Sequence, residues 1–193
     1  EPLAEHSGKP LREFDLAGFR TIEVYDNYLL KIEKSRKYEV IITGREIDLD
    51  ATILELTNET LTIRKRNENG NAVDLKNLDN RVEVLIRTPF LNAVRLNGSS
   101  KARINNFKAN NMDIRLTGVS DAVIHSEINT LEADLNGASR LKLEGHGNTV
   151  HLKASGTSHI NGSEFEVTRA FVRTQGGATA RINAGEIVDA FAE

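Results

Sequence analysis

VRLNGSSKARI, from Val94 to Ile104, is the first of five stretches that repeat one pattern along the chain. The others are IRLTGVSDAVI from Ile114, ADLNGASRLKL from Ala133, LKASGTSHING from Leu152 and VRTQGGATARI from Val172. Their shared glycines recur every 19 or 20 residues, at Gly98, Gly118, Gly137, Gly156 and Gly176. A fixed period of this length indicates a stacked repeat architecture.

Each repeat reads as two β-strands that meet at a corner. Val94 and Leu96 precede Gly98, and Ala102 and Ile104 follow it, so the apolar residues lie two apart, which is the period of a strand. The position two residues after each glycine is always small, and alternation predicts that it faces inward at the corner. These positions are Ser100, Ser120, Ser139, Ser158 and Ala178.

A unit of about 20 residues with two corners cannot bury its apolar side alone, but it can do so when stacked on copies of itself. The sequence therefore predicts an all-β fold, a single-stranded right-handed parallel β-helix of two facing sheets with about 20 residues per coil. A β-meander or sandwich is the alternative, since hairpins also alternate between turns. The near-constant period favours the β-helix, because hairpin loops vary more freely in length.

The chain of 193 residues is expected to form one domain. The longest polar interruption, NENGNAVDLKNLDN at 67–80, is expected to be disordered or decorative, with a functional loop as the alternative. We divide the chain into a leader or linker at 1–12, irregular N-terminal coils at 13–90, regular coils at 91–187 and a C-terminal cap at 188–193.

Composition limits the classes of function. The sequence has no cysteine, which excludes disulfides, thiolate zinc sites and cysteine nucleophiles within it. A net charge of −3 gives no support to nucleic-acid binding, and no stretch is long and apolar enough to span a membrane. The chain begins at Glu1 instead of methionine, so we expect that a leader has been removed and that the protein is exported.

The strand-rich phrases FRTIEV, YEVIITG and ETLTI, followed by the LNGSS, LTGVS and LNGAS corners, resemble the autotransporter-adhesin head (GIN-domain) family of Bacteroidetes-type bacteria. The resemblance covers roughly Phe14 to Ile187, although Gly176-Gly177-Ala178 lacks the corner serine and Val119 is large for its position. It implies an exported protein of the cell surface, outer membrane or periplasm, often with a lipoprotein leader, and a fold similar to pectin-lyase-like β-helices. It assigns no catalytic residue.

A column of charged residues is the clearest candidate for ligand contact. Three residues before each corner glycine stand Arg95, Arg115, Asp134, Lys153 and Arg173, and alternation predicts that they face outward, one coil apart. Five residues after three of the glycines, Arg103, Lys142 and Arg181 form a broken second row. Stacked like charges repel unless solvent, Asp134 or an anionic ligand offsets them. The column is therefore either a solvated face or a binding surface for an acidic polysaccharide.

Signals for catalysis or metal binding are weak. Asp48 and Asp50 are expected on one side of a strand, and His125 and Glu127 form a similar pair, but neither pair has a third converging group. No ligand pattern connects the five histidines, so we expect no metal and no cofactor. They are His6, His125, His146, His151 and His159. The corner serines lack a histidine and a carboxylate in register and are expected to be packing residues, not nucleophiles.

Three functions fit these observations. The favoured one is a non-enzymatic surface module for adhesion, which contacts an acidic polysaccharide or host surface glycan and reaches the membrane only through an upstream lipid anchor. The first alternative is a polysaccharide lyase or hydrolase on the same scaffold. The second is a cytoplasmic scaffold that polymerises through its open ends, and a homo-oligomer is compatible with each reading.

Overall fold

The structure, a computed structural model, describes residues 8–66 and 81–192. Its N-terminal part contains β1 (Leu11–Phe14), β2 (Thr21–Asp26), β3 (Tyr28–Lys34), β4 (Glu39–Thr43), the helix α1 (Glu46–Asp50), β5 (Thr52–Thr57), β6 (Thr60–Lys65), β7 (Val82–Thr88) and β8 (Ala93–Gly98). Five long strands follow, which are β9 (Lys101–Gly118), β10 (Asp121–Leu135), β11 (Arg140–Ala154), β12 (His159–Thr174) and β13 (Thr179–Ala192).

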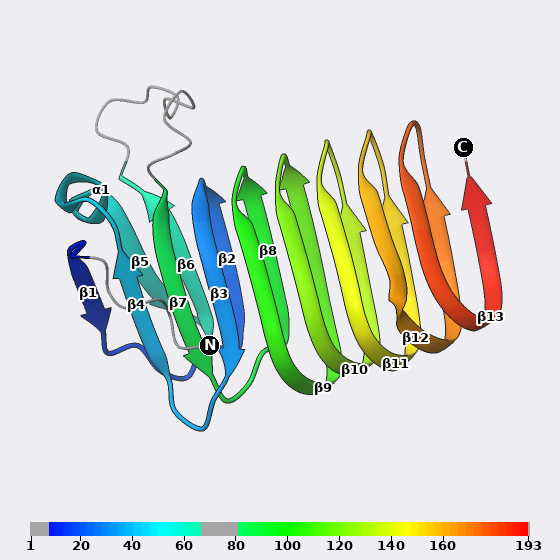
Figure 1. The fold of residues 1–193 in the computed structure, drawn as a ribbon, viewed down its shortest axis with the longest axis horizontal. Coiled ribbons are helices and arrows are strands. Elements are labelled where there is room, and N and C mark those ends of the chain that lie inside the picture. The colour runs from blue at the N-terminus through cyan, green and yellow to red at the C-terminus, as the bar shows by residue number, and fades with distance from the viewer. Residues whose placement is uncertain (1–7, 67–80, 193) are drawn as a thin grey trace.

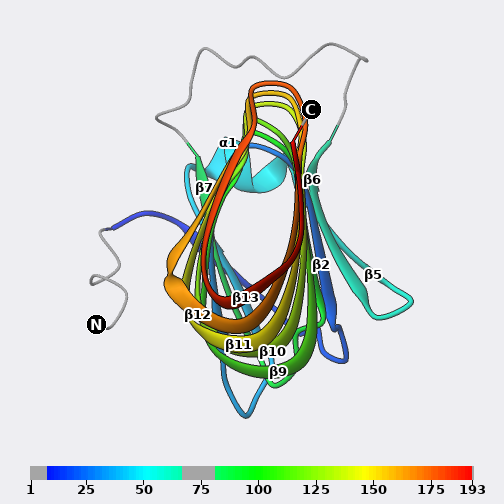
Figure 2. The same ribbon diagram turned by 90° about the vertical axis from the view of Figure 1, so that its right-hand side faces the viewer.

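The long strands stack in parallel and bend in their middle, so that each one belongs to two facing sheets (Figures 1 and 2). The beginning of β9 pairs with β3, and its end pairs with β8. We call the sheet of β5, β6, β2, β8 and the second halves of β9 to β13 face A. The opposite sheet, formed by β1, β4, β7, β3 and the first halves of the long strands, is face B. The predicted parallel β-helix with about 20 residues per coil is confirmed.

The chain turns from face A to face B at the corner glycines. Gly118 has a φ of +85°, and a Cβ atom there would lie 2.4 Å from the carbonyl oxygen of Gly98 in the neighbouring coil. The corner therefore needs glycine both for its backbone conformation and for the close stacking of coils. The small residue two positions later faces inward as predicted, and the side chains of Ser100, Ser120, Ser139 and Ser158 are fully buried.

The core is a set of aliphatic rows that run along the axis of the coil. One row on face A contains Val24, Leu96, Leu116, Leu135 and Ala154, all of which are buried. Each large member stabilises the fold by about 1.5–3 kcal/mol through removal of its side chain from water. Successive residues along each strand therefore alternate between this core and the solvent, as the sequence pattern predicts.

The N-terminal end, where irregular coils are expected at 13–90, combines parallel and antiparallel strand pairs. β2 and β3 form a parallel coil directly beside β8 and β9, and β6 and β7 flank this coil on its other side. The outermost strands are antiparallel: β5 pairs with β6 on face A, while β4 and β1 extend face B. Helix α1 lies at this end of the coil (Figure 2), and its Leu49 is buried in the core.

Two expected boundary segments turn out to contain strands. Leu11 and Arg12, at the end of the expected leader, belong to β1, while residues 1–7 lie outside the described residues. Val188 to Ala192, within the expected C-terminal cap, belong to β13 and continue its pairing with β12. The polar stretch at 67–80 also lies outside the described residues.

Candidate functional site

The charged column lies on the outside of face A. Strand register places Arg95 beside Arg115 and Asp134 beside Lys153, and Glu23 of β2 extends the same row at its N-terminal end. In order along the axis, the row consists of Glu23, Arg95, Arg115, Asp134, Lys153 and Arg173. The stacking read from the sequence is thus present, whereas contact of these side chains with a ligand stays a prediction.

A neighbouring row of carboxylates offsets the positive charge of this column. Asp113 holds the guanidinium of Arg115, with 3.1 Å between Oδ1 and Nε, and Asp189 lies 3.4 Å from Nη2 of Arg173. With Glu132 in the same neighbouring row, the two rows together carry four cations and five carboxylates. Face A is therefore a mixed-charge surface and has no excess of positive charge along the column.

A third row on face A consists of uncharged polar side chains and an aromatic ring. The residue just before each corner glycine is polar, and these residues are Asn97, Thr117, Asn136, Ser155 and Gln175. Tyr25 stands next to Asn97 at the head of the row and is 40% exposed. Its partial burial and the nearby Glu23 carboxylate raise the pKa of the Tyr25 phenol. Face A thus combines hydrogen-bonding ladders with an exposed aromatic side chain.

A shallow depression of about 210 Å³ lies between the charged rows. Its lining includes Arg115, Glu132, Asp134 and Lys153, which are all exposed. His151 borders it and stacks in parallel on Phe171, with 4.6 Å between the ring centroids. Guanidinium, ammonium, carboxylate and imidazole groups in such a depression can donate and accept several hydrogen bonds to one ligand.

The carboxylate pairs considered for catalysis do not converge. Asp48 and Asp50 lie in α1 and not on a strand, so the expected placement was wrong; five residues are too few to show helical periodicity in the sequence. Each is held by a different arginine, since Asp48 Oδ2 lies 2.6 Å from Arg45 Nε and Asp50 Oδ1 lies 2.6 Å from Arg12 Nη2. Each carboxylate is therefore engaged in a separate ion pair.

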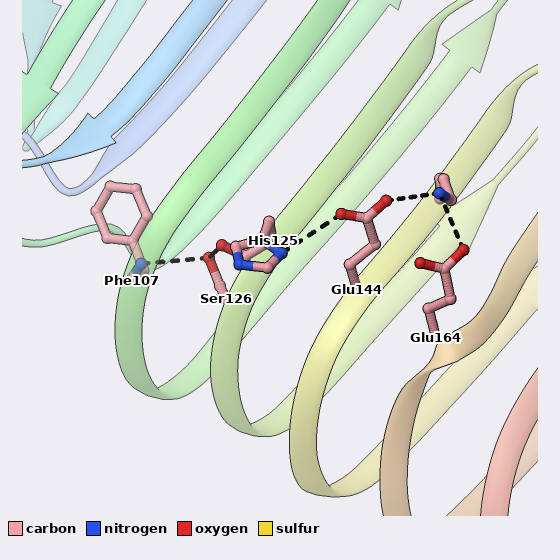
Figure 3. A network of polar contacts seen from close by, with 6 residues as sticks. Phe107, His125, Ser126, Glu144 and Glu164 are labelled. Carbon is pink, nitrogen blue, oxygen red and sulfur yellow. Dashed lines mark hydrogen bonds and ion pairs between the residues drawn. The ribbon is translucent and has the colours of Figure 1, made fainter. Parts of the chain in front are cut away.

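His125 and Glu127 also bind separate partners, at the bend of β10. Nδ1 of His125 lies 3.4 Å from Glu144, which in turn accepts a hydrogen bond of 2.6 Å from Lys142 (Figure 3). The Lys142 ammonium is the largest cause of the lowered pKa of Glu144. Glu127 pairs instead with Lys108 at 3.0 Å, and this hydrogen bond lowers the Glu127 pKa.

Among residues 8–66 and 81–192, no three histidine or acidic side chains are arranged to hold a metal ion. His146 lies 3.8 Å from Glu127, and His159 contacts the hydroxyl of Thr179. His6 lies outside the described residues. The four histidines in the described part of the chain are therefore distributed over several coils.

A groove on the outside of face B was not anticipated. It has a volume of about 690 Å³ and is lined in part by Leu29, Ile41, Leu85 and Val123, which occupy outward positions on the sheet. Arg103 and Lys142 of the predicted second basic row also line it, whereas Arg181 is in register with them but beyond the lining. The overlooked signal is a set of apolar doublets, such as Leu29-Leu30 and Ile41-Ile42, which place one apolar residue on each side of the sheet.

The coil geometry agrees with a family match over most of the chain. The profile of a family described as "Putative auto-transporter adhesin, head GIN domain" matches residues 18–193. The chain belongs to this family. The comparison with curated proteins gave no significant match.

Solved structures from Bacteroides and Parabacteroides species share the fold of this GIN-domain protein. A "putative adhesin" from Bacteroides fragilis is 16% identical, with a TM-score of 0.70 over 96% of this chain and 97% of that one. A "putative lipid binding protein" from Parabacteroides distasonis is 14% identical, with a TM-score of 0.72 over 97% and 95%. A "putative adhesin" from Parabacteroides merdae is 14% identical, with a TM-score of 0.62 over 97% of each chain. At these identities the likeness shows the shared fold.

The described part of this GIN-domain protein contains no helix with the length and apolar character needed to cross a bilayer. Its one helix there, α1, has five residues.

Proposed function

We propose that this GIN-domain chain is a non-enzymatic, exported surface protein that makes adhesive contacts with glycans through face A. The observation that carries the proposal is the set of outward rows on this face, in which charged and uncharged polar side chains recur at the same position in successive coils. The family description as an adhesin head supports the same role.

The charge balance of face A defines the kind of glycan. Because its two charged rows carry nearly equal numbers of cations and carboxylates, a polyanion gains little net attraction along them. A glycan of low charge density fits better, since its hydroxyl groups can exchange hydrogen bonds with Arg, Asn and Asp side chains alike. Repeated positions about 4.8 Å apart allow many weak contacts, whose combination provides avidity.

The alternative is a carbohydrate-active enzyme on the same scaffold. A glycosidase needs a carboxylic acid whose pKa is raised, placed opposite a second carboxylate. Among the described residues, the carboxyl groups with shifted pKa values are Glu33, Glu127 and Glu144; all three pKa values are lowered, and each group is paired with a basic side chain. This arrangement supports a binding role over a hydrolytic one.

A glycan-array screen at low and moderate salt tests the proposal. The binding variant carries R95S, R115S, K153S and R173S together, and the matched control carries K31S, K101S, R103S and R140S on face B. We expect wild type and control to bind the same glycans with a shallow salt dependence, and the face A variant to bind at least about tenfold more weakly. No binding by wild type, or equal loss in both variants, contradicts the role of face A.

The same preparations distinguish binding from catalysis. Wild-type protein is incubated with the bound glycans and with acidic polysaccharides, and reducing ends and unsaturated products are measured over time. We expect neither product to exceed the protein-free control. Steady release of either product would contradict the non-enzymatic role and support the enzymatic alternative. Antibody labelling of intact cells that produce the protein tests its export to the surface. We expect a signal without permeabilisation of the cells.

A further inference from the structure

The groove on face B is large and elongated. Its volume of about 690 Å³ is within the range of roughly 300–1,000 Å³ that is typical of small-molecule sites. Its lining comes from β4, β7, β3, β9, β10, β11 and β12, which are neighbours in that order. At about 4.8 Å per strand, the six steps give a length of about 29 Å along the axis of the coil. The shape suits an extended ligand.

The floor of the groove is aliphatic. Leu29, Ile41, Leu85 and Val123 all point away from the core, at positions that are normally polar on a solvated sheet face. Leu85 is nevertheless only 5% exposed, because its neighbours on face B cover it. None of the described lining residues is Phe, Tyr or Trp. The floor therefore offers a surface for an aliphatic chain and has no aromatic platform on which a sugar ring could stack.

Positive charge surrounds this floor. Six cationic side chains line the groove, against the two carboxylates of Glu83 and Asp121. The cations are Lys9, Lys31, Lys101, Arg103, Arg140 and Lys142. Carboxylates next to the lining, Glu33, Glu144 and Glu164, pair with Lys31 and Lys142. An anionic group on an apolar ligand is therefore attracted by the cations that these carboxylates leave free.

Arg103 is the cation best placed to hold such an anionic group. Lys31 lies 2.8 Å from Glu33, Lys101 lies 3.5 Å from Asp121, and Lys142 lies 2.6 Å from Glu144. Arg103 is exposed and, within the described residues, has no carboxylate within ion-pair distance. It is in register with Lys31 on one side and Val123 on the other, in the middle of the groove. Its guanidinium can bind a carboxylate through two parallel hydrogen bonds.

We propose that the face B groove binds one molecule of a long-chain carboxylate. The aliphatic chain lies along Leu29, Leu85 and Ile41, and the carboxylate is bound by the guanidinium of Arg103, which Val123 adjoins on the other side. This site is separate from the glycan surface on face A and uses different side chains.

A fluorescence titration of the whole chain with cis-parinaric acid, a fluorescent long-chain carboxylate, tests the proposal. Free hexadecanoate is then added as a competitor, and cetyl alcohol, which has the same chain without the charge, is added in a parallel series. We expect saturable binding at one site per chain, displacement by hexadecanoate, and at least about tenfold weaker displacement by the alcohol.

Two groove variants and one control locate the site. Arg103→Ser removes the proposed anion contact, and Val123→Asp places a carboxylate on the floor; we expect each to weaken binding by about ten- to a hundredfold. Arg115→Ser removes a cation from face A and is expected to leave the affinity unchanged. Thermal unfolding of each variant confirms that it is folded, and chemical shifts of the groove amides on ligand addition provide an independent location.

Several results would overturn the proposal. They are no saturable binding by wild type, equal displacement by the neutral alcohol, and unchanged affinity in both groove variants. Sedimentation with vesicles of anionic phospholipid adds a further outcome, since binding to vesicles without binding of the free carboxylate identifies face B as a membrane-contact surface instead. The titration tests face B and uses a face A variant as its control, whereas the glycan screen tests face A. A failure of the carboxylate proposal is therefore distinguishable from a failure of the proposed function.

Discussion

The hydroxyl of Ser100 accepts a hydrogen bond of 2.9 Å from the backbone N–H of Tyr28, in a coil that is 72 residues earlier in the sequence. The same hydroxyl donates to the carbonyl oxygen of Asp26 at 3.1 Å. Both groups belong to the corner of the β2–β3 coil, and the Ser100 side chain is fully buried. The corner serine thus connects the N-terminal coil to the regular repeats.

Ser100→Ala is expected to destabilise the protein more than the same change at the other corners. It leaves the Tyr28 N–H buried without this partner, which costs about 1–3 kcal/mol. The hydroxyls of Ser120, Ser139 and Ser158 donate to carbonyl oxygens and, among the described residues, accept no hydrogen bond from a backbone N–H, so their loss costs about 0.5–1.5 kcal/mol. Urea unfolding of the four variants measures the difference, and equal losses at all four corners would contradict it.

Gly118→Ala is expected to be much more destabilising than Gly176→Ala. Both positions have positive φ, of +85° and +72°, which costs a non-glycine residue about 1–2 kcal/mol. At Gly118 the new Cβ also lies 2.4 Å from a carbonyl oxygen, compared with 3.2 Å at Gly176. Gly177→Ala has no positive φ and only ordinary contacts, and is the matched control with an expected loss below about 0.5 kcal/mol. The free energies of unfolding should follow this order.

The regular coils could be predicted because each one repeats the information that defines it. Glycine at the corner, a small residue two positions later and apolar alternation on both sides recur five times, so the register of one coil fixes that of the next. The charged column follows from the same register. The same register also predicts that Asp113 and Glu132 lie on this side of the sheet, since they precede Arg115 and Asp134 by two residues. Their carboxylates balance the cations, so face A is not a cationic surface.

The sequence predicts irregular coils at the N-terminus but does not locate the corner of the β2–β3 coil, because this corner lacks glycine. Asp26 occupies the position of Gly98 in register and adopts a φ of 73°. An aspartate in this conformation leaves no repeat signal in the sequence. In addition, β2 and β3 pair with β8 and β9, which lie about 70 residues later in the chain. A periodic pattern in a short stretch of sequence does not reveal such distant pairing.

Leu49→Ala is expected to cost about 2–5 kcal/mol, because it creates a cavity where α1 packs on the end of the core. Leu49 is 1% exposed and belongs to the core cluster, whereas Ile47 of the same helix is 71% exposed. Ile47→Ala is therefore the matched control, with an expected change below about 0.5 kcal/mol. Urea unfolding monitored by circular dichroism distinguishes the two variants. A small loss for Leu49→Ala would mean that α1 does not stabilise this end of the coil.

The ion pair between Glu144 and Lys142 is expected to make stability depend on pH in the acid range. The Lys142 ammonium lowers the pKa of Glu144 in the folded state, so folding favours the ionised carboxylate. Its stabilising contribution is complete above the unfolded pKa of about 4.3 and is lost as pH falls through the lower folded pKa. His125, 3.4 Å from Glu144, and Glu164, 3.1 Å from Lys142, also face this pair.

Glu144→Gln tests this expectation through unfolding free energies measured from neutral pH down to the lower limit of folding. The variant should be less stable than wild type at neutral pH, and the difference should shrink as the wild-type carboxylate becomes protonated. Glu132→Gln is the control, because Glu132 is exposed and forms no ion pair with the described residues. Since both substitutions remove one negative charge, a difference that shrinks only for Glu144→Gln identifies the specific pair with Lys142. Parallel curves for the two variants would assign the effect to net charge instead.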